Sequence, residues 1–117
     1  MKRKTIRSHK DFFTPRENPG IGGNLFVIKI KPAKIPNDAR YGLIVSKRIF
    51  KLAVQRNRVK RMMRDWIYVN EDLMMPDFDY IFILREPVLG VKRDDGRREM
   101  QIKLKKLAKN YHNNVNK

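Results

Sequence analysis

The feature that most constrains the fold of this chain is a two-faced helical segment that spans residues 53–70. At about 100° per residue, one side of such a helix collects apolar side chains, and the opposite side collects cations, an amide and a phenol. The apolar side consists of Val59, Met62, Met63, Trp66 and Ile67. The polar side consists of Arg56, Asn57, Lys60, Arg61, Arg64 and Tyr68. The pattern predicts a helix that packs its apolar side on a sheet and exposes its cations on the opposite side, where they can bind a partner.

The cations of this helix belong to a longer stretch, residues 47–64, that contains eight lysines and arginines and no acidic residue. A helix side that is merely solvated usually intersperses acidic partners three or four residues away. The whole chain shows the same imbalance, with 28 Lys and Arg against 12 Asp and Glu and a formal net charge of +16. Such a charge repels itself in a compact state unless a polyanion neutralises it. The sequence therefore indicates a polyanion-binding face, with nucleic acid favoured over an anionic membrane surface.

Two absences in the sequence narrow the class of protein. The chain has no cysteine, which excludes disulfides and thiolate metal sites and is typical of a reducing compartment. No segment approaches the roughly 20 apolar residues that span a bilayer, and no apolar stretch follows the basic start of the chain. We therefore expect a soluble, cytoplasmic protein with a single domain over residues 1–117 and flexible tails over 1–8 and 112–117.

Strands are expected on both sides of the basic helix. Alternating apolar residues predict strands over 25–31 (LFVIKIK) and 41–46 (YGLIVS). A nearly continuous apolar run predicts a third strand over 79–85, covered on both faces. A short additional strand is expected at about 18–23, within a segment rich in glycine.

Two further helices complete the expected fold. A short one is expected over 9–14, capped by Ser8 and ended by Pro15. A final helix is expected over 97–111, after a turn at 94–96 that reads Asp-Asp-Gly. The order is then α-β-β-β-α-β-α, which indicates an α+β protein built as a single-domain α-β sandwich.

The ordered motifs around the basic helix resemble those of one protein family. The segments YGLIVSKRIFKLAVQRNRVKRMMRDW (41–66) and DYIFILREP (79–87) resemble the bacterial ribonuclease P protein component. That family carries a strand ending in a VSK-like motif, an RNR segment that opens a basic helix, and a strand that begins DY or DI and ends in a basic residue before proline. RNR alone is a weak signal, but the ordered set at these spacings is specific, and the likeness extends over about residues 8–110.

The resemblance implies a subunit of a ribonucleoprotein endonuclease that removes the 5′ leader from precursor tRNA. It implies a central sheet with a left-handed crossover around the basic helix 53–70. The expected partners are the catalytic RNA and precursor tRNA, without a membrane or a required protein partner. By this resemblance the catalytic RNA, with bound Mg²⁺, is expected to perform the hydrolysis, so neither catalytic residues nor a metal site are expected in the protein.

The resemblance also implies two sets of binding residues. Residues expected to bind the catalytic RNA are Lys47, Arg48, Arg56, Asn57, Arg58, Lys60, Arg61 and Arg64. Residues expected in a cleft for the single-stranded leader are Phe12, Val27, Lys29, Ile44 and Ser46. The aromatic ring of Phe12 can stack on an unpaired base, with a core position as its alternative, whereas Phe13 is expected to be a packing residue.

The chain departs from the family pattern at two places. The link before RNR, residues 50–54, is one residue longer than usual and lacks the usual glycine. The short first helix meets Pro15 early, and no second aromatic follows one turn after Phe12. The leader cleft is therefore expected to be less aromatic than in other members.

Three other functions fit the residues less well. A self-sufficient nuclease needs paired carboxylates for metals, or a histidine with a partner, but His9 and His112 lie in the expected tails. A bZIP-like DNA-binding helix needs apolar heptads after its basic run, whereas Asn70-Glu71-Asp72 ends this helix and Pro76 follows. A binder of ribosomal RNA is the strongest alternative, and the ordered VSK, RNR and DY motifs argue against it.

Overall fold

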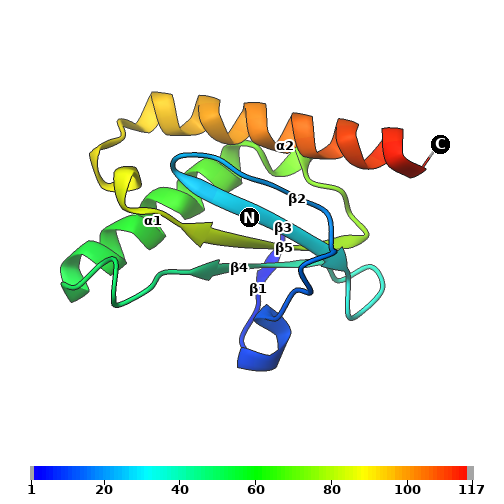
Figure 1. The fold of residues 1–117 in the computed structure, drawn as a ribbon, viewed down its shortest axis with the longest axis horizontal. Helices are drawn as coiled ribbons and strands as arrows, with labels where there is room; N and C mark the ends of the chain where they lie inside the picture. Colours follow the sequence, from blue (N-terminus) through cyan, green and yellow to red (C-terminus); the bar gives the residue numbers. More distant parts are fainter. Residues whose placement is uncertain (1, 116–117) are drawn as a thin grey trace.

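The computed structural model describes residues 2–115, and its elements follow the periodicity of the sequence (Figure 1). The strands are β1 (Lys4–Thr5), β2 (Gly20–Ile21), β3 (Phe26–Pro32), β4 (Arg40–Ile44) and β5 (Phe78–Leu84). The long helices are α1 (Ala53–Val69) and α2 (Arg93–Val115). The short 3₁₀ helices are η1 (His9–Phe12), η2 (Glu71–Leu73) and η3 (Glu86–Gly90). The predicted α+β class is confirmed.

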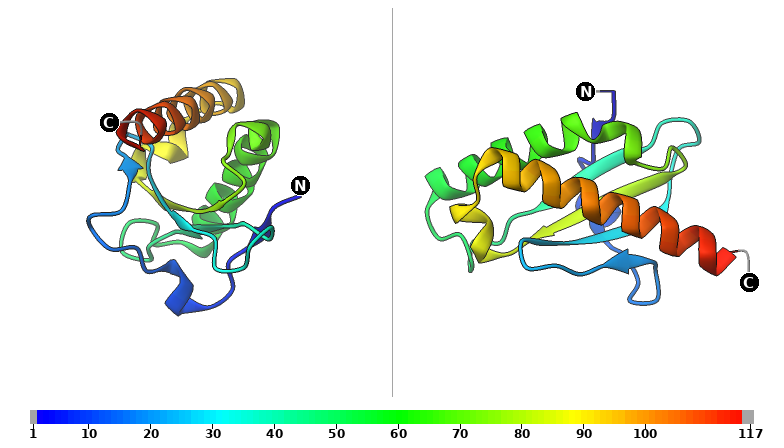
Figure 2. Two further views of the ribbon diagram at one scale, coloured as in Figure 1. Left: turned by 90° about the vertical axis from the view of Figure 1, so that its right-hand side faces the viewer. Right: turned by 90° about the horizontal axis from the view of Figure 1, so that it is seen from above.

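The described strands form one sheet in the order β1-β4-β5-β3-β2. Strand β3 pairs antiparallel with β2 and β5, whereas β4 pairs parallel with β1 and β5. Because β4 and β5 are parallel neighbours, the chain between them crosses over the sheet, and α1 lies in that crossover. The crossover is left-handed, as the resemblance implied, although nearly all such connections are right-handed (Figure 2, right).

The hydrophobic core lies between the sheet and the two long helices, which cover the same face (Figure 2, left). From β3, alternate residues enter this core: Phe26, Ile28 and Ile30. From α1, the buried residues are Val59, Met63, Trp66 and Ile67, with Met62 packed at the edge. From α2, they are Met100, Leu104 and Leu107. The apolar side of the basic helix is thus core, as predicted.

The N-terminal segment, expected as a flexible tail over 1–8, instead contains strand β1. This strand covers the outer edge of β4, and the side chain of Ile6 beside it is buried. The Arg3 guanidinium donates a 2.9 Å hydrogen bond to the carbonyl oxygen of Met75 and lies 5.2 Å from the ring centroid of Tyr80. An open sheet edge and a nearby aromatic ring supply these contacts, and neither is visible in the local composition.

Helix α2 begins four residues earlier than predicted, so Asp94, Asp95 and Gly96 are helical and not a turn. The two aspartates lie in the first turn, where their negative charges interact favourably with the positive end of the helix dipole. Gly96 is needed for a close approach: a Cβ there would lie 2.0 Å from Cε2 of Trp66. The other end of α2 reaches Val115, and residues 116–117 of the expected tail lie outside the described residues.

Candidate nucleic-acid interface

The outward side of α1 carries the predicted cations. Arg58, Arg61 and Arg64 are exposed, as is Asn57, and Lys60 is half-buried. Lys47 and Arg48 are exposed in the turn that follows β4. Within residues 2–115, no carboxylate oxygen lies within 4.0 Å of the charged nitrogens of this cationic set, which comprises Lys47, Arg48, Arg56, Arg58, Lys60, Arg61 and Arg64. Their mutual repulsion is therefore not relieved by acidic neighbours in the described part of the chain.

Arg56 differs from the other cations because its guanidinium already has partners. It donates hydrogen bonds of 2.8 Å to the carbonyl oxygen of Phe50 and 3.1 Å to that of Lys51. Gln55 accepts a 3.3 Å hydrogen bond from the backbone N–H of Leu52, immediately before α1. Arg56 thus fastens the link over 50–54 to the start of the helix, a structural role that the sequence did not indicate.

The opposite face of the sheet carries the residues expected in the leader cleft. Strand register aligns Val27 of β3, Ile83 of β5 and Ile44 of β4 in one row across three strands. All three side chains are half-buried, so this apolar strip is open to a ligand. Ile83 is not among the residues expected in the cleft, although the period of two in DYIFILR places it on this face.

The short helix η1 lies across the neighbouring part of this face (Figure 2, left). Phe12 is half-buried, and its ring sits so close to β4 that a Cβ on Gly42 would lie 2.4 Å from Cε1 of Phe12. Phe13 is 70% exposed, so the expectation that it packs is wrong. Helix η1 ends at Phe12, and Phe13 follows it with extended backbone (φ −68°, ψ 129°), so the second aromatic side chain lies outside.

Two of the other residues expected in the cleft have partners within the protein. The ammonium of Lys29 donates hydrogen bonds to the carbonyl oxygens of Arg16 (3.3 Å) and Asn18 (3.2 Å). The hydroxyl of Ser46 accepts a 3.1 Å hydrogen bond from the backbone N–H of Arg48. Lys29 therefore holds the segment after η1 against β3, and Ser46 holds the turn that follows β4.

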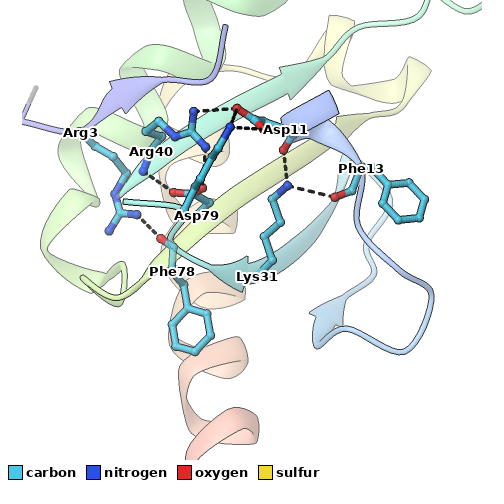
Figure 3. A network of polar contacts seen from close by, with 8 residues as sticks. Arg3, Asp11, Phe13, Lys31, Arg40, Phe78 and Asp79 are labelled. Atoms are coloured by element: carbon cyan, nitrogen blue, oxygen red, sulfur yellow. Dashed lines mark hydrogen bonds and ion pairs between the residues drawn. The ribbon is translucent and has the colours of Figure 1, made fainter. Parts of the chain in front are cut away.

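A network of ion pairs fixes η1 to the sheet (Figure 3). Arg40 donates to Asp11 on one side and to Asp79 on the other, both at 3.1 Å. Asp79 is completely buried and also accepts a 2.7 Å bond from the backbone N–H of Arg40. The ammonium of Lys31 donates to the carbonyl oxygens of Asp11 and Phe13. In Figure 3 the Phe13 ring points away from this network, so the network orients the aromatic side chain without covering it.

The comparisons with known proteins decide the family. The family model described as ribonuclease P matches residues 1–108. The chain belongs to the ribonuclease P protein family. It is 38% identical over 81 residues to the ribonuclease P protein component of Lactobacillus delbrueckii subsp. bulgaricus. The aligned segment covers 68% of this chain and 67% of that protein. It is 31% identical over 116 residues to that of Shouchella clausii, which covers 96% and 94%.

Solved structures of ribonuclease P proteins have the same fold. The protein from Staphylococcus aureus matches with a TM-score of 0.68 and 26% identity, covering 92% of this chain and 94% of that chain. The protein from Thermotoga maritima matches with a TM-score of 0.72 and 23% identity, covering 89% and 97%. As a ribonuclease P protein component, this chain takes part in tRNA processing in association with an endoribonuclease and its RNA.

Other kinds of site are not evident in the described part of this ribonuclease P protein. Among residues 2–115, histidines, aspartates and glutamates do not gather in a group of three that could hold a metal ion. His9 and His112 are exposed on η1 and α2. No helix of the same part is long and apolar enough to cross a membrane.

The attachment of η1 is expected to depend on pH through Asp11. Hydrogen bonds from Arg40 and then Lys34 lower the pKa of the Asp11 carboxyl below its usual value of about 4. A lowered pKa stabilises the folded arrangement above the usual value, and this stabilisation is lost as pH falls through the lowered pKa. We expect the protection factors of the Phe12 and Phe13 amides, which correct for the slower intrinsic exchange at lower pH, to fall on acidification before the core opens. The Asp11→Asn variant should have low protection factors at these amides at neutral pH already. Parent-like protection with the parent's pH dependence in that variant would contradict the role of Asp11.

Proposed function

We propose that this chain is the RNA-binding subunit of ribonuclease P that helps the catalytic RNA to remove the 5′ leader of precursor tRNA. One observation carries the proposal: the cations along α1 and the turn before it lack carboxylate partners in residues 2–115. Phosphates are the counter-charges that such a surface suits, and their binding releases condensed cations from RNA.

The outward side of α1 is proposed to bind the catalytic RNA. Arg58, Arg61 and Arg64 present guanidinium groups, which form paired hydrogen bonds with phosphate oxygens. Asn57 lies among them and can both donate to and accept from a base edge or a ribose hydroxyl. Arg56 contributes its charge, but its hydrogen bonds to the 50–51 carbonyls support a mainly structural role.

The apolar strip of Val27, Ile83 and Ile44 is proposed to bind the single-stranded leader of precursor tRNA. Three adjacent strands make a surface about 10 Å wide, which suits an extended strand with unpaired bases. The half-buried ring of Phe12 on η1 and the exposed ring of Phe13, the next residue, lie beside this face, and aromatic rings stack on bases of any sequence. Lys29 and Ser46 support the surface through the partners described above.

The chemistry is proposed to belong to the catalytic RNA, with Mg²⁺ held mainly by that RNA. The protein then contributes affinity and orientation for both RNAs, which raises the fraction of correctly bound precursor. Its positive charge also offsets phosphate repulsion between catalytic RNA and substrate, a task that otherwise falls to additional Mg²⁺.

Reconstitution tests this proposal. The chain is combined with a bacterial ribonuclease P RNA and precursor tRNA at low Mg²⁺, and cleavage at the 5′ end of the mature tRNA is measured. We expect little cleavage with either component alone and strong stimulation when both are present. Cleavage by the protein without RNA, or no stimulation by a folded protein, would contradict the proposal.

The leader surface gives a more specific prediction. Phe13→Ala should weaken binding of leader-bearing precursor by roughly tenfold, because stacking contributes about 1–3 kcal/mol per base. Binding of mature tRNA, which lacks the leader, should not change. Affinities of the reconstituted enzyme for the two RNAs measure this difference. Ile102→Ala is a matched control, because Ile102 is a 50% exposed apolar side chain on α2; equal losses in both variants would contradict the assignment.

A further inference from the structure

A groove borders the cationic side of α1 and has no role in the function proposed so far. It lies between α1 and the segment from η3 to the start of α2, and its volume is about 510 Å³. In Figure 1 this segment, drawn in yellow, turns the chain from the end of β5 into α2. The apolar part of the lining includes Met62, Leu89 and Val91. The charged part includes Arg58, Arg61, Lys92 and Arg93.

The groove is strongly positive. Asp65, the acidic residue that lines it, accepts hydrogen bonds of 2.7 and 2.9 Å from Arg97. The hydrogen bond from Arg97 lowers the pKa of the Asp65 carboxyl, so this carboxylate stays ionised and paired with Arg97. Arg93 lies 3.6 Å from Asp94, but both side chains are largely exposed and such a pair is weak. The four cations of the groove therefore favour an anionic ligand.

The apolar lining narrows the kind of anion. Met62, Leu89 and Val91 are each half-buried, and they form an apolar surface beside the cations. A free phosphate gains nothing from contact with an apolar surface. A nucleotide, in contrast, can bury its base against that surface while its phosphate contacts the cations. The volume is in the range of small-molecule sites, which is enough for one nucleotide but not for a base-paired helix.

We propose that this groove holds one unpaired nucleotide of the catalytic RNA, with its base against Met62, Leu89 and Val91 and its phosphate between α1 and Lys92-Arg93. The proposal rests on the proposed binding of that RNA along α1, because Arg58 and Arg61 belong to both surfaces. The leader strip lies on the opposite face of the sheet, so the leader does not reach this groove. The RNA footprint thereby extends from α1 to the start of α2.

Site-specific crosslinking tests the proposal directly. The chain has no cysteine, so one introduced thiol is unique. Gly90 lines the groove, and a Cβ there would meet nothing within 4 Å, so Gly90→Cys tolerates a thiol-linked photocrosslinker. With bacterial ribonuclease P RNA and precursor tRNA both present, we expect a crosslink to an unpaired nucleotide of the catalytic RNA. Lys109→Cys, about 24 Å further along α2, should give none.

The outcomes separate the groove from the proposed function. Val54→Cys lies on the exposed side of α1 and should crosslink to the catalytic RNA whenever that helix binds it. A crosslink from Val54→Cys but not from Gly90→Cys would overturn the groove and leave the proposed function standing. A Gly90→Cys crosslink only to precursor tRNA, or only to base-paired nucleotides, would also overturn it. Crosslinks from neither position would contradict the proposed function itself.

A charge variant gives an independent measurement. Lys92→Ala with Arg93→Ala removes two cations of the groove that lie outside α1. We expect affinity for the catalytic RNA to fall about tenfold and the slope of log affinity against log salt to fall by about 1.5. An unchanged affinity and slope in the folded variant would exclude phosphate contacts at this end of the groove.

Discussion

Replacing Arg58, Arg61 and Arg64 together with alanine is expected to weaken binding of the catalytic RNA by roughly 100-fold. Each of the three guanidinium groups is exposed on α1 and lacks a carboxylate partner within residues 2–115. A net contribution of about 1 kcal/mol per phosphate contact gives about 3 kcal/mol in total. The salt dependence should fall at the same time, by about two to three in slope. Equilibrium binding at several salt concentrations measures both effects.

A matched variant separates this surface from the net charge of the whole chain. Lys105, Lys106 and Lys109 are exposed on α2, and replacing them with alanine removes the same total charge. We expect only a small, long-range loss of affinity in this control, because screening weakens charges more than about 10 Å from the RNA. Similar losses in the two triple variants would show that affinity depends on bulk charge and not on the α1 surface. Thermal unfolding of both variants should stay near that of the parent, since the six side chains are exposed.

Gly96→Ala is expected to destabilise the fold by about 2 kcal/mol or more, which lowers the melting temperature by roughly 5–10 °C. In an unconstrained helix the same change stabilises by about 1 kcal/mol, because alanine is the better helix former. Here the added Cβ would lie 2.0 Å from the ring of Trp66, which is 1% exposed and cannot move aside. Either α2 or the ring must shift, and both are part of the core.

Gly90→Ala is the control for Gly96→Ala, because a Cβ at Gly90 meets nothing within 4 Å. Its melting temperature, measured by circular dichroism, should stay within about 2 °C of the parent. A Gly96→Ala variant as stable as the parent would show that α1 and α2 do not pack this closely. The sign of the effect also distinguishes this helical glycine from the turn glycine that the sequence suggested.

The two-sided character of α1 was predictable because it is a local property. Helical period alone separates Val59, Met63 and Trp66 from Asn57, Arg61 and Arg64, and the structure buries the first group and exposes the second. The family was recognisable for a similar reason, since its motifs are contiguous segments in a fixed order. The strands were predictable to within one or two residues, apart from β1.

The roles of single polar residues were not predictable, because their partners are distant in the sequence. Asp11 and Arg40 are 29 positions apart, and Arg40 and Asp79 are 39 apart. Lys29 was expected to face a ligand, but the register of β3 brings its ammonium to the carbonyl oxygens of the segment after η1. Nothing in the residues around Lys29 specifies those carbonyls.

By itself, the sequence determined the main strands and helices, the composition of the core, the cationic side of α1 and the family. These features depend on periodicity, charge and contiguous motifs, all of which act over a few residues. The tertiary structure alone decided where η1 is fastened, which aromatic ring stays exposed, why Gly96 is a glycine, and that a groove joins α1 to the start of α2. Each of these depends on segments that meet only after the sheet and the left-handed crossover have formed, so no local pattern can encode it.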